Sequence, residues 1–391
     1  MGSPNWANRT VWTRDCLEVM RGMNSESVDL IYLDPPFNSK ADYSAPVGSK
    51  AAGAHFRDTW TLRDVDVEWI NIMERSHPAL WRVILAAMSA SDKSYLAYMA
   101  VRLLEMRRIL APTGSIYLHC DPTMSHYLKL TMDAIFGRSA FRSEIVWRIG
   151  WVSGFKTQKR GWIRNHDTLL FYGGGRFNKQ VIPYPVGYVR RDGKPPTGKG
   201  IPIEDTWNCS SGDVLDSIMI KSFSREKVGY PTQKPLALLE RIIRASSNPE
   251  DMVLDPFCGC ATTMVAANSL GRRWAGVDLS QKAGELVMAR MQDRGEMFGK
   301  TVLRTDIPKR TDLGSLPKPR THRRHLYGEQ EGRCNWCRTH FEIGNLEVDH
   351  IVARSAGGTD HPENLQLLCG RCNRVKGDRG MEYLRAKLQL A

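Results

Sequence analysis

Residues 251–280, DMVLDPFCGCATTMVAANSLGRRWAGVDLS, indicate the class of the fold. A short apolar strand ends at Asp255, a turn of small residues follows, and a helix then leads to a second strand that ends at Asp278. Strand, helix and strand in this order are typical of a parallel sheet covered by helices. We therefore predict an α/β domain.

The turn in this stretch has the features of a nucleoside-binding site. Small residues such as Gly259 let the backbone approach a ligand, and Asp278 follows by about 20 residues, the interval at which an acid receives a ribose hydroxyl. The turn lacks the G-x-G-x-x-G pattern, so a dinucleotide is less expected. Asp255 would repel a pyrophosphate but suit a ligand carrying an ammonium and a sulfonium. The alternative is a tight connection that binds no ligand.

A second stretch, VDLIYLDPPFNS at residues 28–39, places a carboxylate at the end of an apolar run. Prolines cannot donate to a strand ladder, and each fixes its own φ, so the strand must end at Asp34. Taken alone, Asp34-Pro35-Pro36-Phe37 is compatible with an ordinary rigid turn. The rest of the chain has to distinguish this from a functional motif.

The remaining sequence predicts further strands and helices and two irregular segments. Strand-like runs occur at 114–121, 144–151 and 166–173, and residues 65–110 have helical periodicity. Residues 173–230 are rich in Gly, Pro, Arg and Lys, and a loop this long is either disordered or functional. Residues 301–325 form a basic linker, which divides a domain at 1–300 from a small domain at 326–391.

Composition favours a nucleic-acid partner. The formal net charge is +13, which favours a polyanion, although charge runs are often only solvated surface. No long apolar run predicts a membrane span, and five of the nine cysteines are scattered without disulfide-framework spacing. We expect a reduced cytoplasmic protein of bacterial, archaeal or phage origin, with no membrane partner.

The two motifs together resemble those of the amino-group DNA methyltransferases. LDPPF resembles their catalytic motif and LDPFCGCATT their S-adenosylmethionine motif, in the order of the circularly permuted β-class. The resemblance covers roughly residues 8–295 and implies a Rossmann-like methyltransferase sheet. It implies cofactor-binding roles for Asp15, Lys234, Asp255, Phe257, Gly259 and Asp278. Two positions depart from the family pattern, Ala261 and Arg14, where glycine is more usual.

This resemblance gives the Asp-Pro-Pro-Phe motif a chemical role. The amine of adenine or cytosine is a poor nucleophile, because its lone pair is delocalised into the ring. Asp34 and the carbonyl of Pro35 would each accept one amino hydrogen, Pro36 would keep the backbone rigid, and Phe37 would stack on a base flipped out of the duplex. Asp-Pro-Pro is associated more with adenine N6 than with cytosine N4, so we predict adenine, with N4-cytosine as the alternative.

The irregular region at about 174–228 lies where this family reads its DNA sequence. Basic residues there would contact phosphates and base edges of double-stranded DNA. The predicted DNA-binding residues are Arg176, Lys179, Arg190, Arg191, Lys194 and Lys199.

The C-terminal segment has the spacing of a zinc site. Two C-x-x-C pairs supply Cys334, Cys337, Cys369 and Cys372 as zinc ligands. The residues between them resemble a zinc-stapled ββα-metal domain of the HNH endonucleases. That resemblance implies His350 as the general base, Asp349 and Asn373 as Mg²⁺ ligands, and Asn364 as a brace for the His350 loop. The alternative is a zinc module that only binds DNA.

We therefore predict a site-specific DNA methyltransferase fused to an HNH endonuclease, a restriction–modification-like protein. The alternatives are a methyltransferase whose zinc module only grips DNA and, less favoured by motif order, an RNA or protein amine methyltransferase. A homodimer is an open alternative to a monomer.

Overall fold

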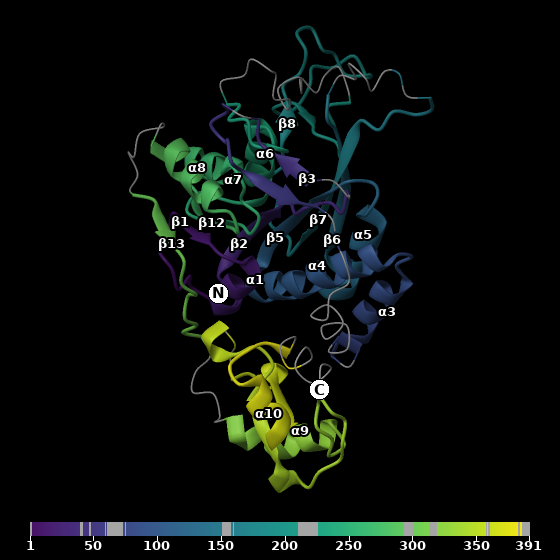
Figure 1. Ribbon diagram of the computed structural model, residues 1–391. Helices are drawn as coiled ribbons and strands as arrows, with labels where there is room; N and C mark the ends of the chain where they lie inside the picture. Colours follow the sequence, from purple (N-terminus) through teal and green to yellow (C-terminus); the bar gives the residue numbers. More distant parts are fainter. Residues whose placement is uncertain are drawn as a thin grey trace.

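The computed structural model shows a large domain and a small C-terminal domain (Figure 1). It describes residues 2–39, 42–46, 48–58, 60, 73–74, 76–150, 158, 160–209, 226–292, 300–312, 319–356, 358, 360–381 and 384. Part of the predicted helical stretch at 65–110 and part of the predicted DNA-reading region at 174–228 therefore lie outside the described residues.

One nine-stranded sheet forms the centre of the large domain, as far as the described residues define it. In spatial order its strands are β10 (Thr206–Trp207), β6 (Phe141–Arg148), β7 (His166–Gly173), β5 (Leu110–Cys120), β2 (Val28–Leu33), β11 (Met252–Asp255), β12 (Arg273–Asp278), β1 (Thr10–Thr13) and β13 (Val302–Arg304). β7 runs antiparallel to both neighbours, and the other neighbouring pairs are parallel. The predicted mainly parallel α/β sheet is confirmed.

Helices cover both faces of this sheet because its strands alternate their side chains between two cores. On β2, Ile31 and Leu33 enter one core, and Leu30 and Tyr32 enter the other. The first core is covered by α1 (Cys16–Gly22), α3 (Pro78–Ala86), α4 (Ala90–Ile109) and α5 (Ser125–Phe136). The second is covered by α6 (Leu236–Ser246), α7 (Thr262–Ser269) and α8 (Gln281–Gln292) (Figure 1). In the part of the chain that the structure describes, none of the helices combines the length and apolar character needed to cross a membrane.

The strands that end in the two predicted motifs are neighbours, although they are far apart in the sequence. Leu30 and Ile31 of β2 pair with Val253 and Leu254 of β11. The carboxyl ends of parallel strands lie at one edge of a sheet, so Asp34 and Asp255 emerge side by side. β12 ends at the same edge, where Asp278 is paired with the last residue of β1. The topology thus brings both motifs to one edge, which we call the motif edge.

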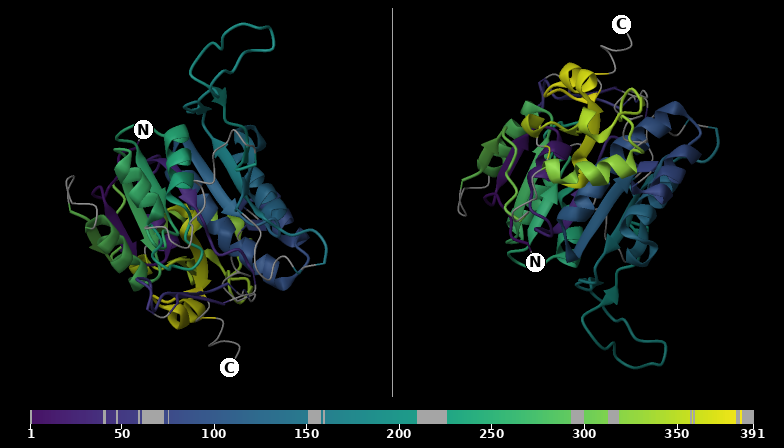
Figure 2. Two further views of the ribbon diagram at one scale, coloured as in Figure 1. Left: turned by 90° about the horizontal axis from the view of Figure 1, so that it is seen from above. Right: turned by 90° about the horizontal axis from the view of Figure 1, so that it is seen from below.

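The irregular region predicted at 173–230 contains little regular structure. Its described part holds the short hairpin of β8 (Val181–Ile182) and β9 (Ile201–Pro202), together with β10. Residues 183–200 form a mostly exposed loop at the tip of this hairpin, here called the finger. Figure 2 shows the finger extending beyond the domain on the side away from the C-terminal domain. A second hairpin, β3 (Asp42–Ser44) with β4 (His55–Arg57), follows the Asp-Pro-Pro-Phe motif.

The predicted linker at 301–325 is partly built into the large domain. Its residues Val302–Arg304 form β13, which pairs with β1 at the edge of the sheet. Further along, Asn24 and Ser25 hydrogen-bond to Thr311 and Asp312. A three-residue edge strand is too short to stand out in a basic, proline-containing sequence, which explains why the sequence indicated a linker throughout.

The C-terminal domain has the predicted ββα arrangement. β14 (Leu346–His350) pairs antiparallel with β15 (Leu365–Cys369), and α10 (Gly370–Lys376) follows directly. A small apolar core joins these elements to α9 (Arg323–Glu329). This domain also contains the 3-10 turns η4 (Pro319–His322), η5 (Ile343–Asn345), η6 (Arg354–Ala356) and η7 (Pro362–Asn364). A further 3-10 turn, η1 (Arg138–Ala140), lies in the large domain between α5 and β6.

Candidate active site and zinc cluster

A pocket of about 210 Å³ opens at the motif edge of the large domain. All ten residues of the large domain to which the sequence assigned a methyl-transfer or cofactor role line it. They are Asp15, Asp34, Pro35, Pro36, Phe37, Lys234, Asp255, Phe257, Gly259 and Asp278. The topology explains this gathering, because these residues lie at or just after the ends of β1, β2, β11 and β12, or just before α6.

Asp34 has one oxygen held by the protein and one oxygen without a partner. The Nζ of Lys234 lies 2.6 Å from Oδ2, in an ion pair whose side chains are 10% (Lys234) and 16% (Asp34) exposed. Oδ1 is buried and accepts no hydrogen bond from the described part of the chain. A buried acceptor without a partner is costly, so this atom is suited to a donor from a ligand. Lys234 was predicted from the family resemblance as a cofactor residue, and here it holds the carboxylate of Asp34.

A carboxylate that sequence reasoning missed fixes the loop after the two prolines. Asp58 accepts hydrogen bonds from the backbone N–H groups of Phe37, Asn38 and Ser39, at 3.1, 2.7 and 2.8 Å. Asn38 adopts a left-handed conformation with φ of 60°. Asp58 is 1% exposed, so its charge is stabilised mainly by these three donors. No sequence motif marks this position.

The ring of Phe37 packs on a buried histidine. His119 stacks against it with ring centroids 5.9 Å apart and is itself 0% exposed. Its Nδ1 lies 2.9 Å from the hydroxyl of Tyr32, and its Nε2 lies 3.3 Å from Oδ2 of Asp167. Burial favours a raised pKa for Asp167, but the hydrogen bond and charge of His119, together with Lys234 and Arg164, lower that pKa to about 2. Both ring nitrogens of His119 are therefore engaged, which fixes the plane against which Phe37 packs.

The turn after β11 is organised by two carboxylates. Asp255 accepts from the backbone N–H of Phe257 at 3.0 Å and from the hydroxyl of Thr263 at 2.5 Å. Burial raises the pKa of Asp255 to about 7, against the opposing effect of these two hydrogen bonds. Asp278 accepts from the N–H groups of Gly259 and Ser280 at 2.9 and 2.8 Å. A cationic ligand beside this pair would offset the cost of burying two carboxylates.

Two residues of the same turn adopt left-handed conformations. Gly259 has φ of 47°, and a Cβ placed there would lie 3.1 Å from the ring of Tyr230. Ala261 has φ of 72° and is fully buried, so it adopts a conformation that disfavours a side chain, by about 1–2 kcal/mol. This explains why glycine is the more usual residue at 261 and why alanine, with the smallest side chain, is tolerated.

Asp15 lies at the start of α1 and is held in place by the protein. It caps the helix by accepting from the N–H of Leu17 at 2.7 Å, and Arg102 donates to its other oxygen at 2.6 Å. The guanidinium of Arg102 lies 3.4 Å from the ring centroid of Tyr98, which also lines the pocket. Sequence reasoning missed Arg102, because nothing in a helical pattern distinguishes a buried arginine from an exposed one.

The predicted DNA-binding residues do not lie at the pocket. Arg176 forms ion pairs with Asp251 at 2.5 Å and Asp29 at 3.7 Å, near the starts of β11 and β2 and therefore at the edge opposite the motif edge. Its guanidinium is thus occupied by the protein's own carboxylates. The other five are exposed on or beside the finger: Lys179, Arg190, Arg191, Lys194 and Lys199. Figure 2 shows that the finger extends away from the β3–β4 hairpin beside the pocket.

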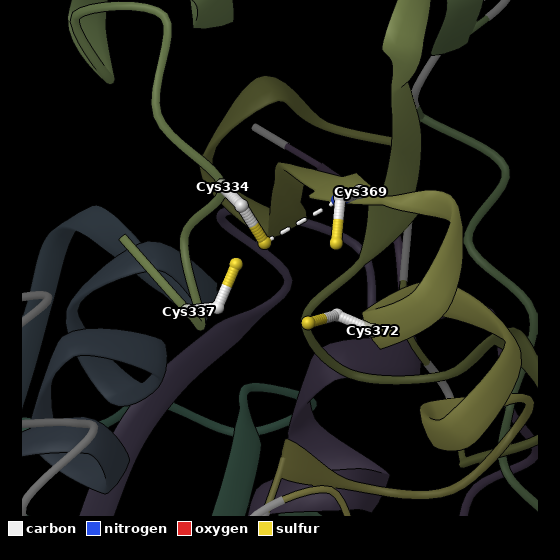
Figure 3. Close-up of side chains that lie close together, drawn as sticks. All are labelled: Cys334, Cys337, Cys369 and Cys372. Carbon is white, nitrogen blue, oxygen red and sulfur yellow. Dashed lines mark hydrogen bonds between the residues drawn. The ribbon is translucent and has the colours of Figure 1, made fainter. Parts of the chain in front are cut away.

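The four C-terminal cysteines form one cluster. The Sγ atoms of Cys334, Cys337, Cys369 and Cys372 all lie within 4.8 Å of one another, and Figure 3 shows them converging. The backbone N–H of Cys369 donates to Sγ of Cys334 at 3.3 Å. A Zn–S distance of about 2.3 Å places tetrahedral sulfurs about 3.8 Å apart, so the donor set and its size fit zinc. Burial and the neighbouring thiols raise the pKa of Cys372, because both disfavour the thiolate. A bound cation would stabilise the thiolate and oppose this rise.

The residues predicted for an HNH nuclease lie around β14. His350 is at the end of this strand, and its Nε2 lies 2.7 Å from Oδ1 of Asp360, which Arg354 also binds. Asn364 accepts from the N–H of Val352 at 2.9 Å and donates to its carbonyl at 3.1 Å. Asn364 therefore braces the chain directly after His350.

The two residues predicted to bind Mg²⁺ have separate partners. Asp349 pairs with Nζ of Lys376, a lysine that is 1% exposed, at 3.0 Å. Asn373 instead donates to Glu347 at 2.5 Å. The oxygens are of the type that Mg²⁺ prefers, but an ammonium group occupies the carboxylate. In this arrangement a magnesium ion would have to displace the ammonium group of Lys376 from Asp349.

Comparisons with known proteins agree with this geometry. The family profile described as DNA methylase matches residues 28–289, and the profile described as HNH endonuclease matches residues 334–379. Type II methyltransferase M.EcaI of Enterobacter cloacae is 26% identical, over 78% of this chain and 74% of that protein. DNA adenine methyltransferase YhdJ of Escherichia coli is 25% identical, over 72% of this chain and 82% of that protein.

One solved structure is similar over much of this chain. PvuII DNA methyltransferase (cytosine-N4-specific) matches 72% of this chain and 88% of that chain, with 14% sequence identity and a TM-score of 0.41. The family profile covers well over half of the present sequence, including both the Asp-Pro-Pro-Phe motif and the turn after β11. The chain belongs to the DNA methylase family, as an amino-group DNA methyltransferase with a C-terminal HNH domain.

Proposed function

We propose that the chain methylates N6 of adenine in double-stranded DNA, using S-adenosylmethionine as the methyl donor. The observation that carries the proposal is the buried, unpartnered Oδ1 of Asp34 on the wall of the pocket. Together with the carbonyl of Pro35 it supplies two acceptors for the two hydrogens of an exocyclic amine. Accepting both hydrogens concentrates the lone pair on nitrogen, which makes the amine a better nucleophile.

The pocket residues divide between the two substrates. Asp255, Gly259 and Asp278 would hold the cofactor, which supplies an electrophilic methyl group on a sulfonium when bound. Phe37, stacked on His119, would receive the face of the flipped base. Lys234 keeps Asp34 oriented through Oδ2, so that Oδ1 can take the proton that the amine loses after methyl transfer.

Adenine is preferred over cytosine on two grounds. The motif contains aspartate before its prolines, and one relative over most of this chain is named a DNA adenine methyltransferase. The test is nucleoside mass spectrometry of plasmid DNA incubated with the protein and S-adenosylmethionine. N6-methyladenine is expected, and 4-methylcytosine as the sole product would overturn the assignment of the base. Asp34→Ala should abolish either product while leaving S-adenosylmethionine binding intact.

For the HNH domain we propose DNA cleavage, which would make the chain restriction–modification-like. His350, braced by Asn364 and hydrogen-bonded to Asp360, supports a general base at this position. The pairing of Asp349 with Lys376 favours a second candidate, a zinc-held module that only binds DNA. Incubation of unmethylated plasmid with Mg²⁺ distinguishes them: cuts that His350→Ala abolishes support cleavage, and intact plasmid that becomes methylated supports the binding module.

A further inference from the structure

A fully exposed tryptophan lies in the loop between β6 and β7. Trp162 is 99% exposed, and it follows Gly161, whose φ is 109°. Its neighbour Arg160 is also exposed. An exposed indole offers a large, flat apolar face with a polar edge, which can stack on a ring outside the folded chain.

The base of this loop is firmly attached. The N–H of Ile149 donates to the carbonyl of Asn165 at 3.0 Å, which closes the loop. Arg164 forms ion pairs with Asp167 and, at 3.6 Å, with Asp121. Trp162 is therefore exposed on a loop whose end is held by the bonds of Arg164 and Asn165.

The loop lies at the motif edge, because β6 ends there and the antiparallel β7 begins there. Direct contacts connect it to the methyl-transfer pocket. Asp167, which Arg164 binds, also contacts His119, and His119 stacks on Phe37. Trp162, two positions before Arg164, therefore lies on the same edge of the sheet as the pocket. The finger, in contrast, extends from the other side of the domain (Figure 2).

We propose that residues 160–164 bind duplex DNA next to the flipped base. Trp162 stacks on the bases that border the vacated position, and Arg160 binds a backbone phosphate. An aromatic face next to a cation matches the chemistry of unstacked bases beside phosphates. This inference rests on the proposed function, since it requires that a base leaves the duplex.

The experiment uses the full-length protein and a duplex that carries its own site. The site is found by mapping methylated bases in treated plasmid, and 2-aminopurine then replaces the target base, because its fluorescence rises when it unstacks. Duplex affinity is measured by anisotropy over a range of salt concentrations, and S-adenosylmethionine affinity by calorimetry. The variants are Trp162→Ala, Trp162→Phe and Arg160→Ala. Leu130→Ala is the matched control, since Leu130 is a 52% exposed apolar residue on α5, outside the predicted DNA-reading region.

Trp162→Ala is expected to weaken duplex binding about tenfold, the loss typical of removing one base-stacking ring, and to abolish most of the 2-aminopurine signal. Affinity for S-adenosylmethionine and the melting temperature should not change, and Trp162→Phe should restore much of the signal. Arg160→Ala should lower the slope of log affinity against log salt by about one, and Leu130→Ala should have less than a twofold effect.

The inference is overturned if Trp162→Ala keeps its duplex affinity and fluorescence signal within twofold of wild type. It is also overturned if Leu130→Ala causes the larger loss. Either result leaves the proposed function standing, provided that the wild-type protein methylates the plasmid. Failure of the wild-type protein to methylate any DNA would overturn the proposed function itself.

Discussion

Asp58 provides a sharp test of how the catalytic loop is held. Its Oδ2 accepts from the N–H groups of Phe37 and Ser39, and its Oδ1 accepts from the N–H of Asn38. In Asp58→Asn one of these oxygens becomes an NH₂ donor, so at least one backbone N–H loses its acceptor and faces another donor. Hydrogen bonds to a charged group contribute about 1.5–3 kcal/mol each.

The expected loss follows from that range. One lost bond of about 1.5–3 kcal/mol corresponds to roughly a 10- to 100-fold reduction in the fraction of molecules with an ordered loop, since about 1.4 kcal/mol is a factor of ten. We expect kcat/KM for DNA to fall by about that factor, because the loop positions Phe37 and the two acceptors for the amine. Affinity for S-adenosylmethionine should change less than threefold, because the turn after β11 is untouched.

The assay is the initial rate of transfer of tritiated methyl from S-adenosylmethionine to DNA at several DNA concentrations. Asp306→Asn, at an exposed carboxylate just after β13 that pairs with Arg304 at 2.5 Å, is the matched control and should behave as wild type. If Asp58→Asn retains more than a third of the wild-type kcat/KM, the three hydrogen bonds do not hold the loop in its active form.

Three further predictions concern the cofactor turn and the zinc cluster. The folded-state pKa of Asp255, about 7, exceeds its ordinary value of 3.8, so its protonation favours the folded state. That contribution is fully present below about pH 3.8 and is lost as the pH rises through 7. The melting temperature of the ligand-free protein, measured against Asp255→Asn, should therefore fall between pH 5 and 8, while affinity for a cationic cofactor rises over the same range; a flat difference would contradict the assignment. Gly259→Ala should weaken S-adenosylmethionine binding at least tenfold by calorimetry, because the new methyl group meets the ring of Tyr230 in a conformation that disfavours a side chain, and unchanged affinity would show that the backbone does not approach the ligand there. A chelator should remove one zinc ion per chain by atomic absorption and unfold the C-terminal domain while methyl transfer persists; equal loss of both would show that the two domains fold as one unit.

The sequence was sufficient to predict which motif residues lie together at the pocket, but not the residues that support them. Asp34, Asp255 and Asp278 could be placed together because each ends an apolar strand, and parallel strands end at a common edge. Asp58 and His119 could not be predicted, because their roles depend on which backbone groups and rings reach them in the folded chain. Arg176 shows the limit of charge patterns, since a run of cations does not reveal which member pairs with a carboxylate distant in the sequence.

The same limit applies to the C-terminal domain. The spacing of the four cysteines predicted a compact cluster, because C-x-x-C pairs present their sulfurs at short range. The pairing of Asp349 with Lys376 and of Asn373 with Glu347 depends instead on how α10 packs on β14, which residue spacing does not encode.

The edge strand β13 has a consequence for where the chain could act on DNA. The segment after β13 is bonded to Asn24 and Ser25 as far as Asp312, and Pro319, the first residue of η4, is seven residues further along the chain. Seven residues span at most about 25 Å when fully extended, or about seven base pairs of B-form DNA. This short covalent connection limits how far the C-terminal domain can lie from the large domain. Any cut that it makes on the same duplex would therefore fall within a narrow distance of the methylated base.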